Sequence, residues 1–127
     1  RPGPPSKGLR CQHNLKMIAL AVIMYEQDND KRPEAFSDIT MYLKTPEIMR
    51  CPSNVNKPGD LTDVDSWSDY IFIPRDVNLP VSKAVIVYCP HVHNSKDVRN
   101  AAFADGIIDL VPLNQITGQT YNDIFKP

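Results

Sequence analysis

The side chains with the most chemistry to offer lie in two short segments, each beginning with a Cys-Pro pair. One is Cys51-Pro52, and the other is residues 89–93, CPHVH. Together they supply two thiols and two imidazoles, which is enough for a tetrahedral zinc ion. The four candidate zinc ligands are Cys51, Cys89, His91 and His93. Zinc proteins usually gather cysteines in Cys-x-x-Cys pairs, and neither cysteine has such a partner, so the spacing disfavours zinc.

The redox state of the thiols depends on the compartment. The chain has three cysteines, Cys11, Cys51 and Cys89, which cannot all pair with one another. Outside the cytoplasm, a Cys51–Cys89 disulfide is the simplest arrangement. Closing a loop of that length would contribute about 4 kcal/mol by restricting the unfolded chain. In a cytosolic protein, all three are expected to be buried thiols.

Catalytic motifs are missing from the sequence. A nucleophile pair of Cys89 with His91 or His93 is conceivable, but the disulfide would block it. The chain contains no Gly-x-Ser-x-Gly elbow, His-Glu-x-x-His motif, phosphate loop or dinucleotide fingerprint. We therefore expect no enzyme.

Four aspartates offer hard oxygen ligands for calcium. They are Asp60, Asp63, Asp65 and Asp69. Their spacing departs from the EF-hand pattern at the third ligand, and no glycine follows, so a solvated acidic loop over residues 54–68 is favoured. Trp67 in this loop is either a partner contact or a local lid on the core. We expect no resident cofactor, with calcium as the alternative.

Length and charge set the broad class. The chain has 127 residues and a formal net charge of −1, which suits one domain with a real core. No basic block draws it to nucleic acid or to an anionic membrane surface. Twelve prolines against five glycines favour short elements joined by rigid loops. The abrupt start without Met leads us to expect a piece whose natural N-terminus is missing.

The element that must position these side chains is a long amphipathic helix over residues 6–32, after a Pro-rich lead-in over residues 1–5. Ser6 is its expected N-cap, and Pro33 ends it. One apolar stripe consists of Leu15, Ile18, Val22 and Tyr25, and a second of Met17, Leu20, Ala21 and Met24. The nine consecutive apolar residues 17–25 are too few for a membrane span, which needs about 20. One stripe is expected to pack on the domain, and the other either joins the same core or faces a neighbour.

The rest of the chain predicts an α+β fold. A short helix over residues 38–43 is expected, with Ser37 as N-cap and Phe36 stapled onto Met41. Strands are predicted over residues 69–73, 83–88, 101–104 and 107–111, and a last helical turn over residues 120–126. Asp105-Gly106 is a hairpin signal between the last two strands, and residues 89–100 are expected to form a loop. The expected architecture is one long helix packed on a small antiparallel sheet.

Three segments resemble bacterial type IV pilin-like proteins. Residues 11–34 resemble the stretch that follows the membrane-spanning half of the pilin helix, with a Cys-x-x-Asn-Leu-Lys-x-Ile phrase. The matching positions are Cys11, Asn14, Leu15, Lys16, Ile18, Ala21, Tyr25, Asp28, Asp30 and Pro33. Residues 50–54, RCPSN, resemble the Cys-Pro-Ser segment. Residues 100–111, NAAFADGIIDLV, resemble the Asp-Gly hairpin of the prepilin-type, processing-associated histidine–Asp-Gly subfamily.

The histidines of that subfamily are displaced in this chain. The subfamily places a histidine nine residues before Asp-Gly, whereas eleven residues separate His93 from Asp105 and thirteen separate His91 from it. The histidine that usually follows Asp-Gly is Ile107 here.

The resemblance implies a pilin-like single domain, residues 1–127, that serves as a structural subunit of a type IV pilus or a type II secretion-like filament. Such a subunit is extracytoplasmic and anchored in the inner membrane by an apolar half-helix that would precede this chain. The helix face Met17, Leu20, Ala21 and Met24 would then contact neighbouring pilin-like subunits. The alternative function is an extracytoplasmic metal-binding or thiol module that uses Cys51, Cys89, His91 and His93.

Overall fold

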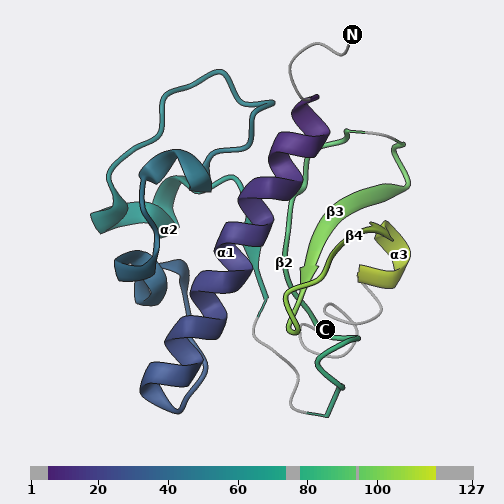
Figure 1. Cartoon of the computed structure of the whole chain (residues 1–127). Coiled ribbons are helices and arrows are strands. Elements are labelled where there is room, and N and C mark those ends of the chain that lie inside the picture. Colours follow the sequence, from purple (N-terminus) through teal and green to yellow (C-terminus); the bar gives the residue numbers. More distant parts are fainter. Residues whose placement is uncertain (1–5, 74–77, 94, 117–127) are drawn as a thin grey trace, which may run out of the picture.

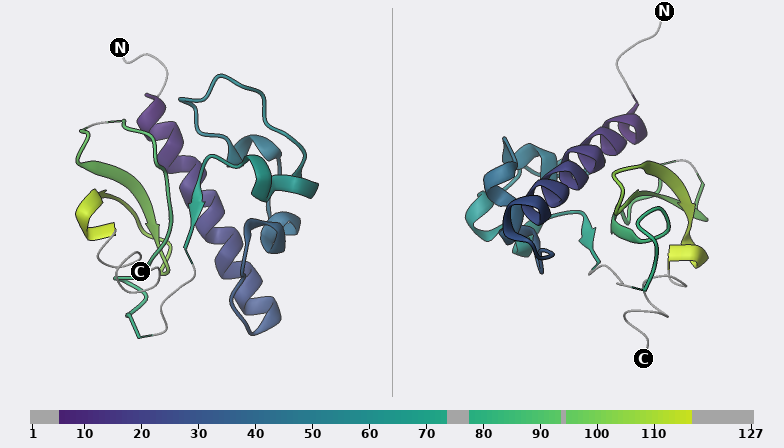
Figure 2. Two further views of the ribbon diagram at one scale, coloured as in Figure 1. Left: turned by 180° about the vertical axis from the view of Figure 1, so that it is seen from behind. Right: turned by 60° about the horizontal axis from the view of Figure 1, so that its bottom comes forward.

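The structure is a computed structural model that describes residues 6–73, 78–93 and 95–116. Its longest element, helix α1 (Lys7–Asn29), lies between an antiparallel sheet and a group of short helices (Figure 1). Two further views show the same order of layers (Figure 2). The predicted α+β class is therefore confirmed. The lead-in over residues 1–5 and the turn over residues 120–126 lie outside the described residues.

Helix α1 begins where the sequence predicts and ends earlier. The Ser6 side chain accepts a hydrogen bond from the Leu9 N–H at 3.2 Å, which confirms the N-cap. The predicted end at residue 32 is wrong, because Asp30 takes a left-handed conformation with φ 57° and terminates the helix. Asp tolerates this conformation better than most residues with a Cβ. Among the described helices, none is long and apolar enough to cross a membrane.

Four strands form the sheet in the order β1-β2-β3-β4. They are β1 (Ile71–Phe72), β2 (Val85–Tyr88), β3 (Val98–Phe103) and β4 (Ile108–Pro112). Strand β2 is interior to the sheet, as its β-branched run predicts, and it is buried on both faces. Ile86 joins the core under α1, and Val85 joins a smaller core on the other side.

The hairpin between β3 and β4 is confirmed, with Gly106 at φ 90°, a conformation that favours glycine. Two other strand predictions need correction. Strand β3 starts at Val98, because Val98 pairs with Pro112, so the predicted loop over residues 89–100 is too long. Strand β1 covers only Ile71–Phe72 of the predicted residues 69–73.

Five short helices complete the described fold: η1 (Phe36–Tyr42), η2 (Pro46–Met49), η3 (Leu61–Asp63), α2 (Val64–Trp67) and α3 (Leu113–Ile116). The predicted α-helix over residues 38–43 is instead the 3-10 helix η1. Its N-cap is Ala35, so the predicted Ser37 cap is wrong. The predicted staple is also wrong, since Met41 is 80% exposed while Phe36 packs edge-on against Phe72.

The acidic segment 54–68 is more ordered than a solvated loop. It contains η3 and α2, and Val64 is fully buried. The Asp65 carboxylate accepts hydrogen bonds from the backbone N–H groups of Phe36 and Ser37, at 2.9 and 3.2 Å. An aspartate distant in the sequence therefore caps η1, and for this reason local capping rules missed it.

Replacing this distant cap is expected to destabilise the domain. Asp65→Ala leaves two N–H groups of η1 without their acceptor, and loss of a cap costs about 1–2 kcal/mol. Urea unfolding followed by circular dichroism measures the change. The matched control is Asp63→Ala two residues away, an exposed aspartate that makes no side-chain capping bond to α2. Equal losses of stability in the two variants would contradict the capping role.

Candidate metal centre at the helix–sheet junction

Three cysteines and one histidine meet where α1 crosses the sheet. Cys11 comes from the second turn of α1, Cys51 follows η2, and Cys89 directly follows β2. His93 lies four residues beyond Cys89. Their ligand atoms all lie within 4.8 Å of one another, and the three cysteines are fully buried. Within the described ranges, this is the only group of three or more Cys, His, Asp or Glu side chains suited to a metal ion.

The distances inside the cluster are short and similar. The Sγ atoms of Cys51 and Cys89 are 3.6 Å apart. His93 Nε2 lies 3.4 Å from the Cys51 sulfur and 3.6 Å from the Cys89 sulfur. The imidazole therefore presents one nitrogen to both thiols at once. Such a group of soft donors can bind a thiophilic metal ion.

Each cysteine is held by its own element. Cys11 extends the buried stripe of α1 by one step, since it precedes Leu15 by four residues. The backbone N–H of Cys51 donates to the Asp69 carboxylate at 2.7 Å. The backbone N–H of Cys89 donates to the Asn100 carbonyl of β3 at 2.9 Å. The thiols thus sit on a helix, a braced turn and the end of a central strand.

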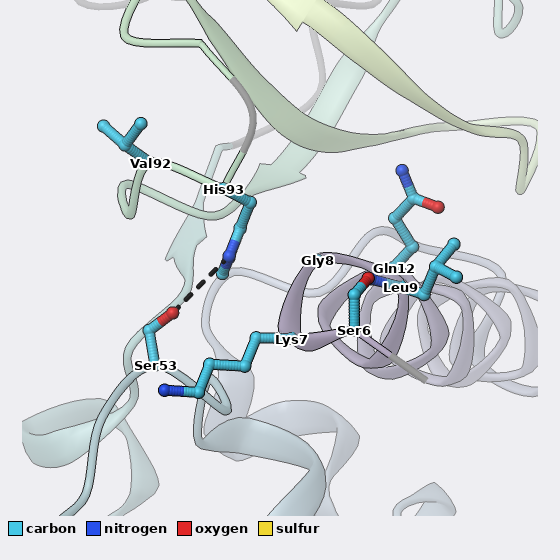
Figure 3. A pocket seen from close by; sticks show the side chains of 8 residues that line it. All are labelled: Ser6, Lys7, Gly8, Leu9, Gln12, Ser53, Val92 and His93. Carbon is cyan, nitrogen blue, oxygen red and sulfur yellow. Dashed lines mark hydrogen bonds between the residues drawn. The ribbon is translucent and has the colours of Figure 1, made fainter. Parts of the chain in front are cut away.

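The second nitrogen of His93 is also engaged. His93 Nδ1 lies 3.4 Å from the hydroxyl oxygen of Ser53, a residue of the same turn as Cys51 (Figure 3). Histidine ligands of metals almost always use their other ring nitrogen in this way, which fixes the ring orientation. His93 therefore lies between a hydroxyl on one side and two thiols on the other.

The three thiols shift one another's pKa values. Hydrogen bonds with the Cys11 and Cys89 thiols lower the pKa of Cys51, and the Ser53 backbone N–H lowers it further. The hydrogen bond with Cys51 raises the pKa of Cys11 to about 11. Hydrogen bonds with Cys11 and Cys51 raise the pKa of Cys89, and the His91 backbone N–H opposes that rise. Hydrogen bonds from its two neighbours thus favour the ionised form of Cys51.

The structure brings together three of the four zinc candidates from the sequence. Cys51, Cys89 and His93 converge, but His91 points elsewhere, with its Nε2 3.9 Å from the Asp69 carboxylate. Its predicted place in the ligand set is wrong, because the turn at Cys89-Pro90 carries only His93 inward. Sequence reasoning missed Cys11 as the fourth member. The signal that could have identified Cys11 is its position on the buried stripe of α1.

Two further predictions concern these thiols, namely a Cys51–Cys89 disulfide and a nucleophile pair of Cys89 with a histidine. All three cysteines are free thiols in the structure, so the Cys51–Cys89 disulfide stays a prediction for oxidised protein. Cys89 and His93 lie 3.6 Å apart, as a nucleophile pair would, but Cys89 is fully buried and its pKa is raised. A protonated thiol without solvent access is a poor nucleophile.

The four aspartates proposed for calcium do not form a cluster. Two of their carboxylates bind the protein itself. Asp65 caps η1, and Asp69 accepts from the Cys51 N–H, the Arg50 guanidinium and the Asn54 amide. Trp67 covers Arg50, whose guanidinium carbon lies 5.0 Å from the ring centroid, which favours the local lid.

Polar residues beside the cluster fasten α1 to its surroundings. Asn100 of β3 is buried, donates to the Gly8 carbonyl at 3.2 Å and accepts from Gln12 at 3.0 Å. Lys16 donates to the Gly106 carbonyl at 2.7 Å. Asn14 donates to the Arg50 carbonyl at 3.2 Å. The helix therefore has polar attachments to β3, to the hairpin turn and to the turn before Cys51.

Asn100 is expected to contribute measurably to stability. Asn100→Ala leaves the partly buried Gly8 carbonyl and Gln12 amide without their hydrogen-bond partner, which costs about 1–3 kcal/mol. Chemical unfolding gives the change in free energy. Asn56→Ala, at an exposed position, is the matched control and is expected to change stability by less than about 0.5 kcal/mol. A loss at Asn100 no greater than at Asn56 would contradict the fastening role.

The proposed assembly face of α1 is only partly exposed. Leu20 is 39% exposed and Met24 is 46% exposed, whereas Met17 is half-buried. Ala21 is fully buried within the domain, so it does not lie on an exposed face.

No protein-family model, curated protein or solved structure matches this chain. The fold and the site together define a class: an α+β domain with one long helix on a four-stranded antiparallel sheet and a Cys3His cluster at their junction.

Proposed function

We propose that the chain is the pilin-like domain of a structural, non-enzymatic subunit that assembles into an extracytoplasmic filament. The observation that carries this proposal is the way α1 is fastened along an antiparallel sheet by residues of all three pilin-like segments. Asn14 and Lys16 belong to the first segment, Arg50 to the second, and Asn100 and Gly106 to the third. Their side chains or carbonyl groups meet in the hydrogen bonds of the helix–sheet junction.

This use of the motif residues favours a scaffold over a catalyst. Asn14, Lys16 and Asn100 make bonds that hold the helix in place, and the cysteines of these segments are buried. A subunit that assembles through its helix needs this rigidity, because the helix must keep one orientation relative to the domain. The apolar residues Leu20 and Met24, left exposed on α1, are the surface offered to neighbouring subunits.

The first test is the gene sequence that precedes Arg1. A short basic leader, a prepilin-type cleavage site and about 20 apolar residues running into Leu9 are expected, because a precursor anchored in the inner membrane needs them. An ordinary cleavable signal peptide, or an upstream sequence without an apolar segment, would overturn the proposal. The inner-membrane anchor and the extracytoplasmic location depend on the same result.

The second test separates assembly from folding. In the full-length protein, Leu20→Glu and Met24→Glu are expected to abolish filament assembly, seen by electron microscopy of shear fractions. Both positions are exposed, so the Tm of the isolated chain is expected to change little. Gln27→Glu, at an exposed polar position on the same helix, is the matched control. Filaments from the Leu20 and Met24 variants at the wild-type level would contradict the assembly face.

The alternative function, a metal-binding module, is favoured by a separate observation, the Cys3His cluster. A filament subunit can also bind a metal ion, so the two functions do not exclude each other.

A further inference from the structure

Three buried thiols and one imidazole nitrogen lie close together at the helix–sheet junction. Core packing accounts for buried cysteines, but it does not account for an imidazole nitrogen that faces two of them. We propose that Cys11, Cys51, Cys89 and His93 bind one zinc ion, with Cys11 in the place that the sequence pattern gave to His91. This inference is independent of the filament proposal.

Three of the six distances among the ligand atoms match the edges of a zinc tetrahedron. Zinc–sulfur bonds of about 2.3 Å and zinc–nitrogen bonds of about 2.0 Å place two sulfurs about 3.8 Å apart and a sulfur and nitrogen about 3.5 Å apart. The Cys51 and Cys89 sulfurs are 3.6 Å apart, and His93 Nε2 lies 3.4 and 3.6 Å from them. The sulfur–sulfur distance is far from the disulfide bond length of about 2.05 Å. All four ligand atoms lie within 4.8 Å of one another, so the three distances to Cys11 need to shorten by no more than about 1.3 Å to accept the ion.

The surroundings of the ligands fit a metal site as well. His93 presents Nε2 to the thiols while Nδ1 faces the Ser53 hydroxyl, so a zinc-bound imidazole would donate its Nδ1–H to that oxygen.

The donor set selects the metal and its role. Thiolates and imidazole favour zinc or copper(I) over calcium and magnesium, which prefer oxygen ligands. Four protein ligands leave no coordination position for water or substrate, which is typical of a structural zinc site. The ion would join α1, the turn after η2 and the end of β2, three elements that are distant in the sequence.

One member of the cluster borders a pocket. The pocket has a volume of about 370 Å³ and lies between the first turn of α1 and the turn that carries His93. Figure 3 shows His93 on one wall and Ser6, Lys7 and Gly8 on the other. The three thiols are fully buried and do not line this pocket, so His93 is the ligand nearest to solvent.

The test measures metal bound by the reduced chain. After reduction, removal of the reductant without air and addition of zinc, one zinc per chain is expected by mass spectrometry of the desalted protein. Cobalt(II) gives a second readout on the unaltered protein: the visible bands of tetrahedral coordination together with a sulfur-to-cobalt charge-transfer band. These two measurements need no variant, so a variant that fails to fold does not decide the result.

Variants then identify the ligands. Cys11→Ser and His93→Gln are expected to lower zinc affinity by more than about 100-fold in competition with a chromophoric chelator, because even outer partners contribute 10–100-fold. Ser53→Ala is expected to lower it by about 10–100-fold through His93. The matched control is His91→Gln, which changes the neighbouring histidine outside the cluster and is expected to leave affinity unchanged.

Three results would overturn the proposal. One is less than a tenth of an equivalent of zinc on the fully reduced, folded chain. Another is cobalt spectra without the charge-transfer band. The third is loss of zinc with His91→Gln while His93→Gln still binds it at the wild-type level. None of these bears on the upstream sequence or the assembly variants, so the zinc site and the filament proposal fail separately.

Discussion

Stripping zinc from the loaded domain is expected to lower its Tm by roughly 10 to 20 °C. A ligand held at about 1,000 times its dissociation constant stabilises the folded state by about 4 kcal/mol, and a chain of this size converts that into such a shift. The physical reason is that the ion joins three elements whose contacts are otherwise non-covalent. Differential scanning calorimetry under reducing conditions, with and without a strong chelator, gives the value.

The His91→Gln variant is the control for this prediction, since it keeps all four ligands and is expected to show the same chelator-induced shift. Adding zinc back to the stripped protein is expected to restore the original Tm, which excludes slow aggregation as the cause. A Tm that stays constant while the chelator removes one equivalent of zinc would contradict a stabilising role for the ion.

Asp69→Ala is expected to destabilise the domain by about 3 kcal/mol, even without metal. The Asp69 and Arg50 side chains are only 9% and 14% exposed, and breaking a buried ion pair by removing one partner costs about 3–5 kcal/mol. The same carboxylate also accepts the Cys51 N–H and the Asn54 amide. We take the lower end of the range because the pair retains some solvent contact. Urea unfolding of reduced, metal-free protein measures the change.

The same substitution is expected to weaken zinc binding by about 10–100-fold, because the turn that carries Cys51 loses its brace. The matched control is Asp60→Ala, an exposed aspartate of the neighbouring acidic segment 54–68, for which the stability change is expected to stay within about 0.5 kcal/mol. A loss of stability at Asp69 no larger than at Asp60 would show that Arg50 and Cys51 do not depend on this carboxylate.

A zinc ion at the proposed site would lie close to the start of α1. Cys11 lies in the second turn of α1, near the end to which a preceding apolar half-helix would connect. A metal ion there would fix the start of the helix against β2, so that force along the helix would pass into the sheet. Zinc binding and the upstream gene sequence therefore test two separate parts of this proposed arrangement: the attachment of α1 to the sheet and the preceding half-helix.

The amino-acid sequence determined the features that depend on near neighbours. Ser6 caps α1 through Leu9, three residues away, and Asp105-Gly106 forms the predicted turn because glycine accepts a positive φ. The β-branched run of β2 predicted a buried central strand. Each of these signals acts within a few residues, and therefore local pattern is sufficient to predict it.

Only the tertiary structure decided which side chains meet. Cys51 is 38 residues from Cys89 and 42 from His93, and these pairs share no local pattern. The sequence offered His91 and His93 as equal candidates, and the path of the chain after β2 brings only His93 to the thiols. Asp65 and Asp69, which look like solvated acids in the sequence, cap η1 across 29 residues and brace Cys51 across 18 residues. These contacts form because α1 packs against the sheet. That packing depends on core residues from the whole chain, and no single segment contains all of them.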